Sequence, residues 1–216
     1  MNEKKVVLAI GAHPDDIELG CSGTLLRHVN NKDKIYLLIL TKGEASGDPD
    51  IRTEECYKSA EILCAEKIFF GELSDTKIED GIHTINTIEN IINKIKPDII
   101  YSHSYKDTHQ DHRNTSYATL SAGRRVKKIL MYESPTSFIE FSPHVYIDIK
   151  KSFEEKKRII RIFSSQSDKV WWPTGKKASA AIEGLGFYRG YQVGMEVAEA
   201  FEVARFAINS NEKIFH

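Results

Sequence analysis

An apolar, β-branched run at residues 6–10 (VVLAI) leads without a spacer into the polar stretch GAHPDDIELG at residues 11–20. Such a run is typical of a buried strand. Pro14 suits a first helical turn, and apolar residues then recur at helical spacing from Leu19 to Val29. The pattern predicts a strand that passes directly into a helix, with polar side chains gathered at the junction.

Strand-like and helix-like segments alternate along the rest of the chain. Further strands are expected at residues 34–40, 67–70, 98–102, 128–132 and 144–149, and helices at residues 52–65, 82–95, 116–125, 152–163 and 176–185. Residues 184–190 are expected to form a glycine-rich loop, and residues 195–206 fit a strand or a helix. Because this alternation is typical of α/β proteins, we expect a mostly parallel sheet sandwiched between helices. No repeat or linker interrupts the chain, so residues 1–216 are expected to form a single domain.

Composition and charge narrow the classes of partner. The 216 residues carry a formal net charge of -1, which gives no overall attraction to nucleic acid or to an anionic membrane. No run approaches the roughly 18–20 apolar residues of a membrane-spanning helix. The three cysteines are odd in number and lack C-x-x-C spacing, which favours a reducing, cytoplasmic location over a disulfide scaffold. A small neutral or mildly charged substrate is the expected partner.

Two polar clusters follow expected strands. His13 and Asp16 are three residues apart, so a helical turn would point both side chains the same way, while Asp15 would point about 100° away. After the strand at 98–102, the segment HSYKDTHQDHRN at residues 103–114 carries His109 and His112, with Asp111 between them to fix an imidazole tautomer. Both clusters should reach the carboxyl edge of the sheet, where ligand sites of such sheets form.

The two clusters predict a metal site. Two imidazoles and one carboxylate hold zinc in many hydrolases and leave a position open for water. The same ligands would also suit Fe²⁺ or another divalent ion. A further carboxylate could take a proton from the water, and a further imidazole could stabilise the oxyanion that forms as the carbonyl becomes tetrahedral.

A long loop at residues 41–51 adds candidates for substrate contacts. Loops at the carboxyl ends of strands often carry ligand contacts, so Glu44, Asp48 and Arg52 are predicted to bind substrate. The chain has no G-x-G-x-x-G, no P-loop and no G-x-S-x-G motif, which leaves nucleotide binding and serine hydrolase chemistry without support.

These residues resemble a known enzyme family. The paired motifs AHPDD (residues 12–16) and HQDH (residues 109–112) are similar to those of the LmbE-like, or PIG-L-type, zinc-dependent N-deacetylases, which remove acetyl groups from N-acetylglucosamine derivatives. The similarity continues through residues 15–23, the helix that begins at Arg52, YESP at 132–135, RGYQVG at 189–194 and AEAF at 198–201, and therefore spans nearly the whole chain.

The resemblance implies a Rossmann-like fold and a role for each residue of the motifs. His13, Asp16 and His112 would hold Zn²⁺, Asp15 would be the general base, and His109 would stabilise the oxyanion with Asp111 behind it. Arg52 would bind an amino-sugar substrate. Homo-oligomers are common in the family, so the resemblance also allows a homo-oligomer.

Two departures and two alternatives limit what the resemblance implies about substrate. Ser164 stands where many members have histidine, and Asp107 stands where some have a tyrosine near the oxyanion. The first alternative is an amidase that acts on a different amide, such as a thiol-sugar conjugate. The second is a non-catalytic sugar-binding module, which the complete motifs disfavour. The sugar, its aglycone and the pathway stay open.

Overall fold

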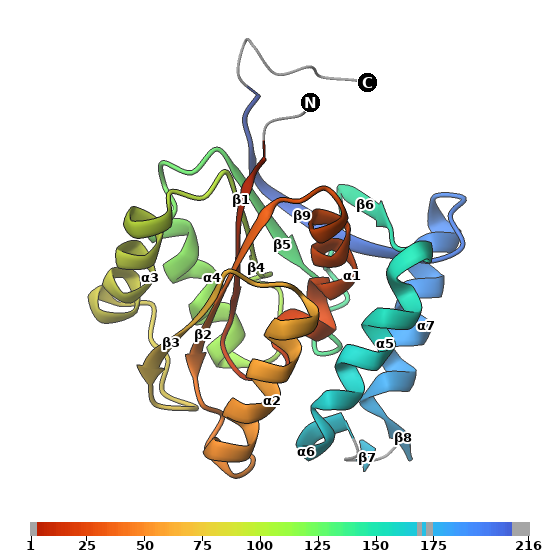
Figure 1. The fold of residues 1–216 in the computed structure, drawn as a ribbon, viewed down its shortest axis with the longest axis horizontal. Helices are drawn as coiled ribbons and strands as arrows, with labels where there is room; N and C mark the ends of the chain where they lie inside the picture. The colour runs from red at the N-terminus through yellow and green to blue at the C-terminus, as the bar shows by residue number, and fades with distance from the viewer. Residues whose placement is uncertain (1–3, 168–169, 172–174, 209–216) are drawn as a thin grey trace.

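The computed structural model describes residues 4–167, 170–171 and 175–208, and its centre is one seven-stranded sheet with the order β3-β2-β1-β4-β5-β9-β6 (Figure 1). The strands are β1 (Val6–Gly11), β2 (Lys34–Thr41), β3 (Lys67–Leu73), β4 (Ile99–His103), β5 (Lys128–Tyr132), β6 (Val145–Asp148) and β9 (Ala198–Phe206). The first five strands of that order are parallel, and β9 runs antiparallel to both β5 and β6. The predicted mostly parallel sheet is confirmed.

Helices cover both faces of the sheet. One face carries α1 (Asp16–Asn30), α2 (Pro49–Ile62) and α5 (Phe153–Ile162), and the other carries α3 (Ile82–Ile95) and α4 (Gln110–Ala122). The two-residue period of β1 explains the two cores, because Val7 packs with Leu25 on one face while Leu8 packs with Ile88 on the other. Shorter elements complete the chain: η1 (Lys150–Ser152), α6 (Ser164–Ser167), and a small hairpin of β7 (Val170–Trp171) and β8 (Lys176–Lys177).

One expectation about the last third of the chain is corrected, and one open alternative is resolved. Residues 184–190 form no loop, because they lie inside α7 (Ala178–Gln192), and the ambiguous end of the chain is the strand β9. Two of the glycines that suggested a loop instead permit close packing: a Cβ on Gly186 would lie 2.9 Å from the side chain of Val197, and one on Gly190 would lie 2.7 Å from the carbonyl oxygen of Met195. The segment after α7 therefore turns back tightly against that helix.

The order of the strands places the carboxyl ends of β1 and β4 side by side. From β1 the chain passes to β2 and β3 on one side, while β4 and β5 lie on the other, so the topology switches direction between β1 and β4. A crevice at such a switch point is the usual ligand site of this architecture. The segments that begin at Ala12 and Ser104 both start there.

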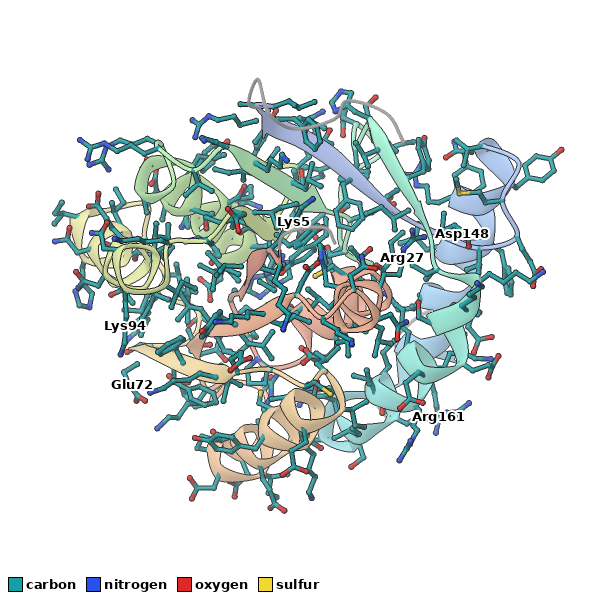
Figure 2. The ribbon with its side chains drawn as sticks, turned by 45° about the horizontal axis from the view of Figure 1, so that its top comes forward. Lys5, Arg27, Glu72, Lys94, Asp148 and Arg161 are labelled. Atoms are coloured by element: carbon teal, nitrogen blue, oxygen red, sulfur yellow. The ribbon has the colours of Figure 1, made fainter. Side chains whose placement is uncertain are left out.

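The first helix is also tied to the far edge of the sheet. Arg27 on α1 donates a hydrogen bond of 2.5 Å to the carbonyl oxygen of Asp148 at the end of β6 (Figure 2). Within the described part of the chain, no helix is both long enough and apolar enough to cross a bilayer.

Candidate active site

The turn between β1 and α1 has an unusual backbone. Asp15 precedes the first residue of α1 and adopts φ 96°, in the left-handed region that non-glycine residues rarely enter. The backbone N–H of His13 donates to Asp16 Oδ2 at 2.7 Å, which closes the turn. Asp16 points toward His13 and Asp15 toward Arg52, as expected, although the turn that separates them is not the helical turn on which that expectation rested.

Asp16 lies at the centre of three imidazoles. Its carboxylate is 3.4 Å from His13 Nδ1, 3.3 Å from His112 Nε2 and 3.0 Å from His103 Nε2. The structure therefore brings together the three predicted metal ligands, which come from segments about a hundred residues apart. The described residues form three groups whose ligand atoms all lie within 4.8 Å of one another, and the predicted set of three is not among them. The groups are Asp16 with His103 and His112, His13 with His109 and His112, and His13 with Asp75 and Asp111.

His103 belongs to the site, although no role was predicted for it. It is fully buried at the end of β4, and its ring stacks on that of His112 at 3.9 Å between centroids. Its Nε2 also lies 3.2 Å from the backbone nitrogen of Ala12, so that atom is already engaged. Its Nδ1 is buried without a hydrogen-bond partner. The ring of His103 packs against that of His112. The signals for it in the sequence were its place at the end of an apolar strand and its position in a segment with three histidines.

Carboxylates lie behind the imidazoles of His13 and His112. His13 Nε2 is 3.0 Å from Asp75 and 3.1 Å from Asp111, and His112 Nδ1 is 3.1 Å from Asp107 Oδ2. This last contact has an ion-pair distance without the alignment of a hydrogen bond. Asp107 is in turn held by Ser134 Oγ and by Thr136 Oγ1 at 2.8 Å. Carboxylates in these positions orient metal-binding imidazoles.

The predicted partner of Asp111 was wrong. We expected its carboxylate to lie behind His109, but it accepts hydrogen bonds from the backbone of Thr76 and Ile78 and lies against His13. Only the backbone N–H of Asp111 reaches His109, whose Nδ1 accepts it at 3.2 Å. In its neutral form, His109 therefore carries its proton on Nε2.

The charges of this cluster fit a divalent cation. Burial would lower the pKa of His13, but the carboxylates of Asp111, Asp16 and Asp75 outweigh burial and raise it to about 12. Burial would also lower the pKa of His112, but the carboxylates of Asp16 and Asp107 outweigh burial and raise it to about 9. The carboxylates thus draw positive charge into a buried site. The donor set of imidazoles and carboxylates suits Zn²⁺ and, as an alternative, Fe²⁺.

Two further side chains have pKa values shifted in opposite senses. Burial, assisted by the charge of Asp16 and opposed by Arg52, raises the pKa of Asp15 to about 8. Burial, with the neighbouring His112 and His13, lowers the pKa of His109. A carboxylate with raised proton affinity and an imidazole kept neutral are suited to proton transfer and to hydrogen-bond donation, respectively.

These side chains open onto a cavity of about 420 Å³, which we call the catalytic cleft. His13, Asp15, Asp16, His109 and His112 line it, whereas His103 does not. The remaining lining residues are Leu19, Ala45, Ser46, Arg52, Asp75, Thr76, Ser134, Pro135, Thr136 and Gln166. The volume lies in the range of small-molecule sites.

Two predicted substrate contacts lie elsewhere. Glu44 and Asp48 are exposed, and neither lines the catalytic cleft. Glu44 Oε1 accepts a hydrogen bond from the backbone N–H of Asp75 at 2.8 Å, and Asp48 caps α2 by accepting from Asp50 and Ile51. Both carboxylates shape the loop at the mouth of the cleft.

Comparison with known proteins assigns the chain to a protein family. Residues 8–123, more than half of the chain, match the PIG-L family, described as GlcNAc-PI de-N-acetylase. A deacetylase of Escherichia coli K12, YaiS, is 35% identical over 159 residues, which cover 70% of this chain and 86% of YaiS. The chain belongs to the PIG-L (LmbE-like) deacetylase family. It is accordingly an N-deacetylase, a hydrolase of amide bonds.

Other PIG-L relatives have named substrates. The diacetylchitobiose deacetylase of Thermococcus kodakarensis is 27% identical over 223 residues, covering 92% of this chain and 82% of that protein. The N,N′-diacetylchitobiose deacetylase of Pyrococcus horikoshii, solved with an inhibitor, is 21% identical and superposes with a TM-score of 0.82, covering 93% of this chain and 84% of that one. The second comparison confirms the fold of the PIG-L family.

Arg52, the third predicted substrate contact, lines the cleft but is held by the protein. Its buried guanidinium donates to the carbonyl oxygens of Gly43 at 2.8 Å and Pro14 at 2.7 Å, and lies 3.6 Å from Asp15 Oδ1. Gly43 has φ +68°, and a Cβ there would lie 2.0 Å from the guanidinium. Arg52 therefore braces the loop against the turn that carries Asp15.

Arg52→Ala is expected to lower kcat as well as raise KM, and to lower the free energy of unfolding by about 1–3 kcal/mol, because buried carbonyl groups lose their donor. Kinetics and thermal unfolding of the purified variant measure both effects. Arg158→Ala, which removes an exposed arginine, is the control. A rise in KM with kcat and stability unchanged would instead make Arg52 a substrate contact alone.

Proposed function

We propose that this deacetylase removes the acetyl group from an N-acetylglucosamine-type sugar or glycoconjugate, with Zn²⁺ held by His13, Asp16 and His112. The observation that carries the proposal is that Asp15 and His109 line the same cleft as these three side chains. A bound Zn²⁺ would supply Lewis-acid chemistry, lowering the pKa of water and polarising the amide carbonyl. Names of the relatives support the amino-sugar substrate.

Asp15 fits the role of general base. It lines the cleft beside Asp16 and lies outside the three groups of candidate ligands, so its carboxylate stays available for a proton. Burial raises the proton affinity of this carboxylate, so in its ionised form it can take a proton from the attacking water and then return one to the leaving nitrogen. The amide C–N bond then breaks to give acetate and a free amine.

His109 fits the role of oxyanion stabiliser. Its Nδ1 accepts the backbone N–H of Asp111, which leaves Nε2 as the donor. A neutral imidazole can donate a hydrogen bond to the carbonyl oxygen as negative charge develops there. Asp107, Ser134 and Thr136 form the support behind His112, while Asp75 and Asp111 support His13.

An acetate-release assay across N-acetylglucosaminyl substrates, with and without added zinc, tests the proposal. We expect acetate from at least one such sugar, loss of activity on chelation, and recovery with zinc. A thiol-sugar conjugate in the same panel tests the alternative amidase. Cleavage of that conjugate without release of acetate from any N-acetyl sugar would overturn the proposal in favour of the alternative.

Metal binding is expected to release close to two protons at neutral pH. In the metal-free protein, the raised pKa values keep both His13 and His112 protonated at pH 7, and an imidazole must lose that proton to bind a metal. Metal affinity should therefore rise with pH. Calorimetric titration of the metal-free protein with zinc, in buffers of different ionisation enthalpy, counts the protons, and a binding enthalpy independent of buffer would contradict this expectation.

A further inference from the structure

A small cavity lies beside Asp15, and we call it the inner cavity. Its volume is about 10 Å³, and its lining residues are Asp15, Glu18, Leu19, Ile160, Phe163 and Ser167. Asp15 and Leu19 also line the catalytic cleft, so the two spaces share part of one wall. The proposed general base therefore borders both the cleft and the inner cavity.

Glu18 brings a second carboxylate to the inner cavity. It lies in the first turn of α1 and is only 1% exposed. Its Oε1 accepts a hydrogen bond of 2.6 Å from Ser59 Oγ of α2, which fixes the side chain. Its Oε2 is buried and has no hydrogen-bond partner among the described residues. Because a buried carboxylate oxygen without a partner is costly, such an atom in a folded protein normally binds a protein group or an ordered water.

The inner cavity has the size and the polar groups that suit one water molecule. A cavity needs about 10–15 Å³ to hold a water, and the water needs two to four polar partners. Glu18, Asp15 and Ser167 each bring a polar side chain to the lining, whereas the side chains of Leu19, Ile160 and Phe163 are apolar. The volume excludes any larger ligand. A water in this cavity would therefore be held by the two carboxylates and the hydroxyl.

We propose that an ordered water in the inner cavity bridges Glu18 Oε2 and the carboxylate of Asp15, which makes Glu18 a positioning residue for the general base. This inference rests on the role of Asp15 in the proposed function. A carboxylate has about four acceptor sites, so Asp15 can accept a hydrogen bond from this water and still take a proton from the cleft. A water can donate to a carboxylate or accept from a carboxylic acid, so the bridge forms in either protonation state of Glu18.

A crystal structure of the wild type, at a resolution that shows ordered waters, tests the bridge directly. We expect one water at about 3 Å from both Glu18 Oε2 and an oxygen of Asp15. Absence of that water, or a metal ion in its place, would overturn the inference. The readout does not depend on activity: if the water is present but no N-acetyl sugar releases acetate, the proposed function fails and the bridge stands.

Two substitutions of Glu18 test its effect on the base. Glu18→Leu removes the acceptor and is expected to lower kcat by about tenfold, with KM and bound metal near the wild-type values, because Glu18 does not line the cleft. Glu18→Gln is expected to retain most of the activity, because its amide can accept the hydrogen bond from Ser59 and donate one to the water. Glu61→Leu, at an exposed glutamate of α2, is the control.

The two variants separate a water bridge from other roles of Glu18. Equal loss of kcat in Glu18→Leu and Glu18→Gln would assign the effect to the charge of Glu18 and overturn the bridge, as would an unchanged kcat in Glu18→Leu. Thermal unfolding reports whether each variant folds. If Glu18→Leu does not fold, the presence or absence of the water in the wild-type crystal structure still decides.

Discussion

Asp15→Asn is expected to lower kcat by at least about 10²- to 10⁴-fold while bound metal stays near the wild-type amount. The carboxylate of Asp15 has a raised pKa and can take a proton from the water. The side-chain amide of asparagine cannot accept that proton. Asparagine also tolerates the left-handed backbone of this position, so the turn should persist. Deacetylase rates beside metal analysis of the same preparation measure the two quantities.

Asp50→Asn is the control for Asp15→Asn, because Asp50 is an exposed aspartate in the first turn of α2. Loss of metal from Asp15→Asn together with loss of activity would make Asp15 a ligand and would remove the evidence for its role as base.

Asp16→Asn is expected to weaken metal binding by more than the roughly 10- to 100-fold typical of lost outer-shell contacts, with activity partly restored at high zinc. The reason is geometric: the carboxylate of Asp16 lies within 3.4 Å of His13, His103 and His112, so its charge is central to the cluster. Competition with a chelator of known affinity measures the loss. Retention of metal by Asp16→Asn, with loss from Asp15→Asn, would reverse the two assignments.

The sequence predicts most of this fold because the buried strands are short apolar runs. Residues 6–10 and 128–132 needed no tertiary information, since β-branched and aliphatic side chains on a strand covered on both faces leave a continuous pattern. The motifs around His13 and His112 were also visible, because their spacing puts polar groups on one side of a turn. That these motifs meet follows from the parallel sheet.

The residues that the sequence left without a role act through contacts between distant segments. Asp75 reaches His13 from the loop after β3. Asp107 lies against His112, and hydrogen bonds from Ser134 and Thr136, in the segment after β5, hold its carboxylate there. No periodic pattern in the neighbouring sequence distinguishes such residues from ordinary surface residues. The glycines of α7 suggested a loop, but the missing side chains of Gly186 and Gly190 permit close packing of the helix against the segment that follows it.

The left-handed backbone of Asp15 has a consequence for protein engineering. A non-glycine residue in such a region costs the fold about 1–3 kcal/mol, which glycine would not cost. Screens that select this chain for heat resistance alone are therefore expected to favour glycine at this position. The same residue is the proposed proton acceptor. Selection for thermostability without selection for turnover is therefore expected to replace Asp15 by glycine and so to abolish activity.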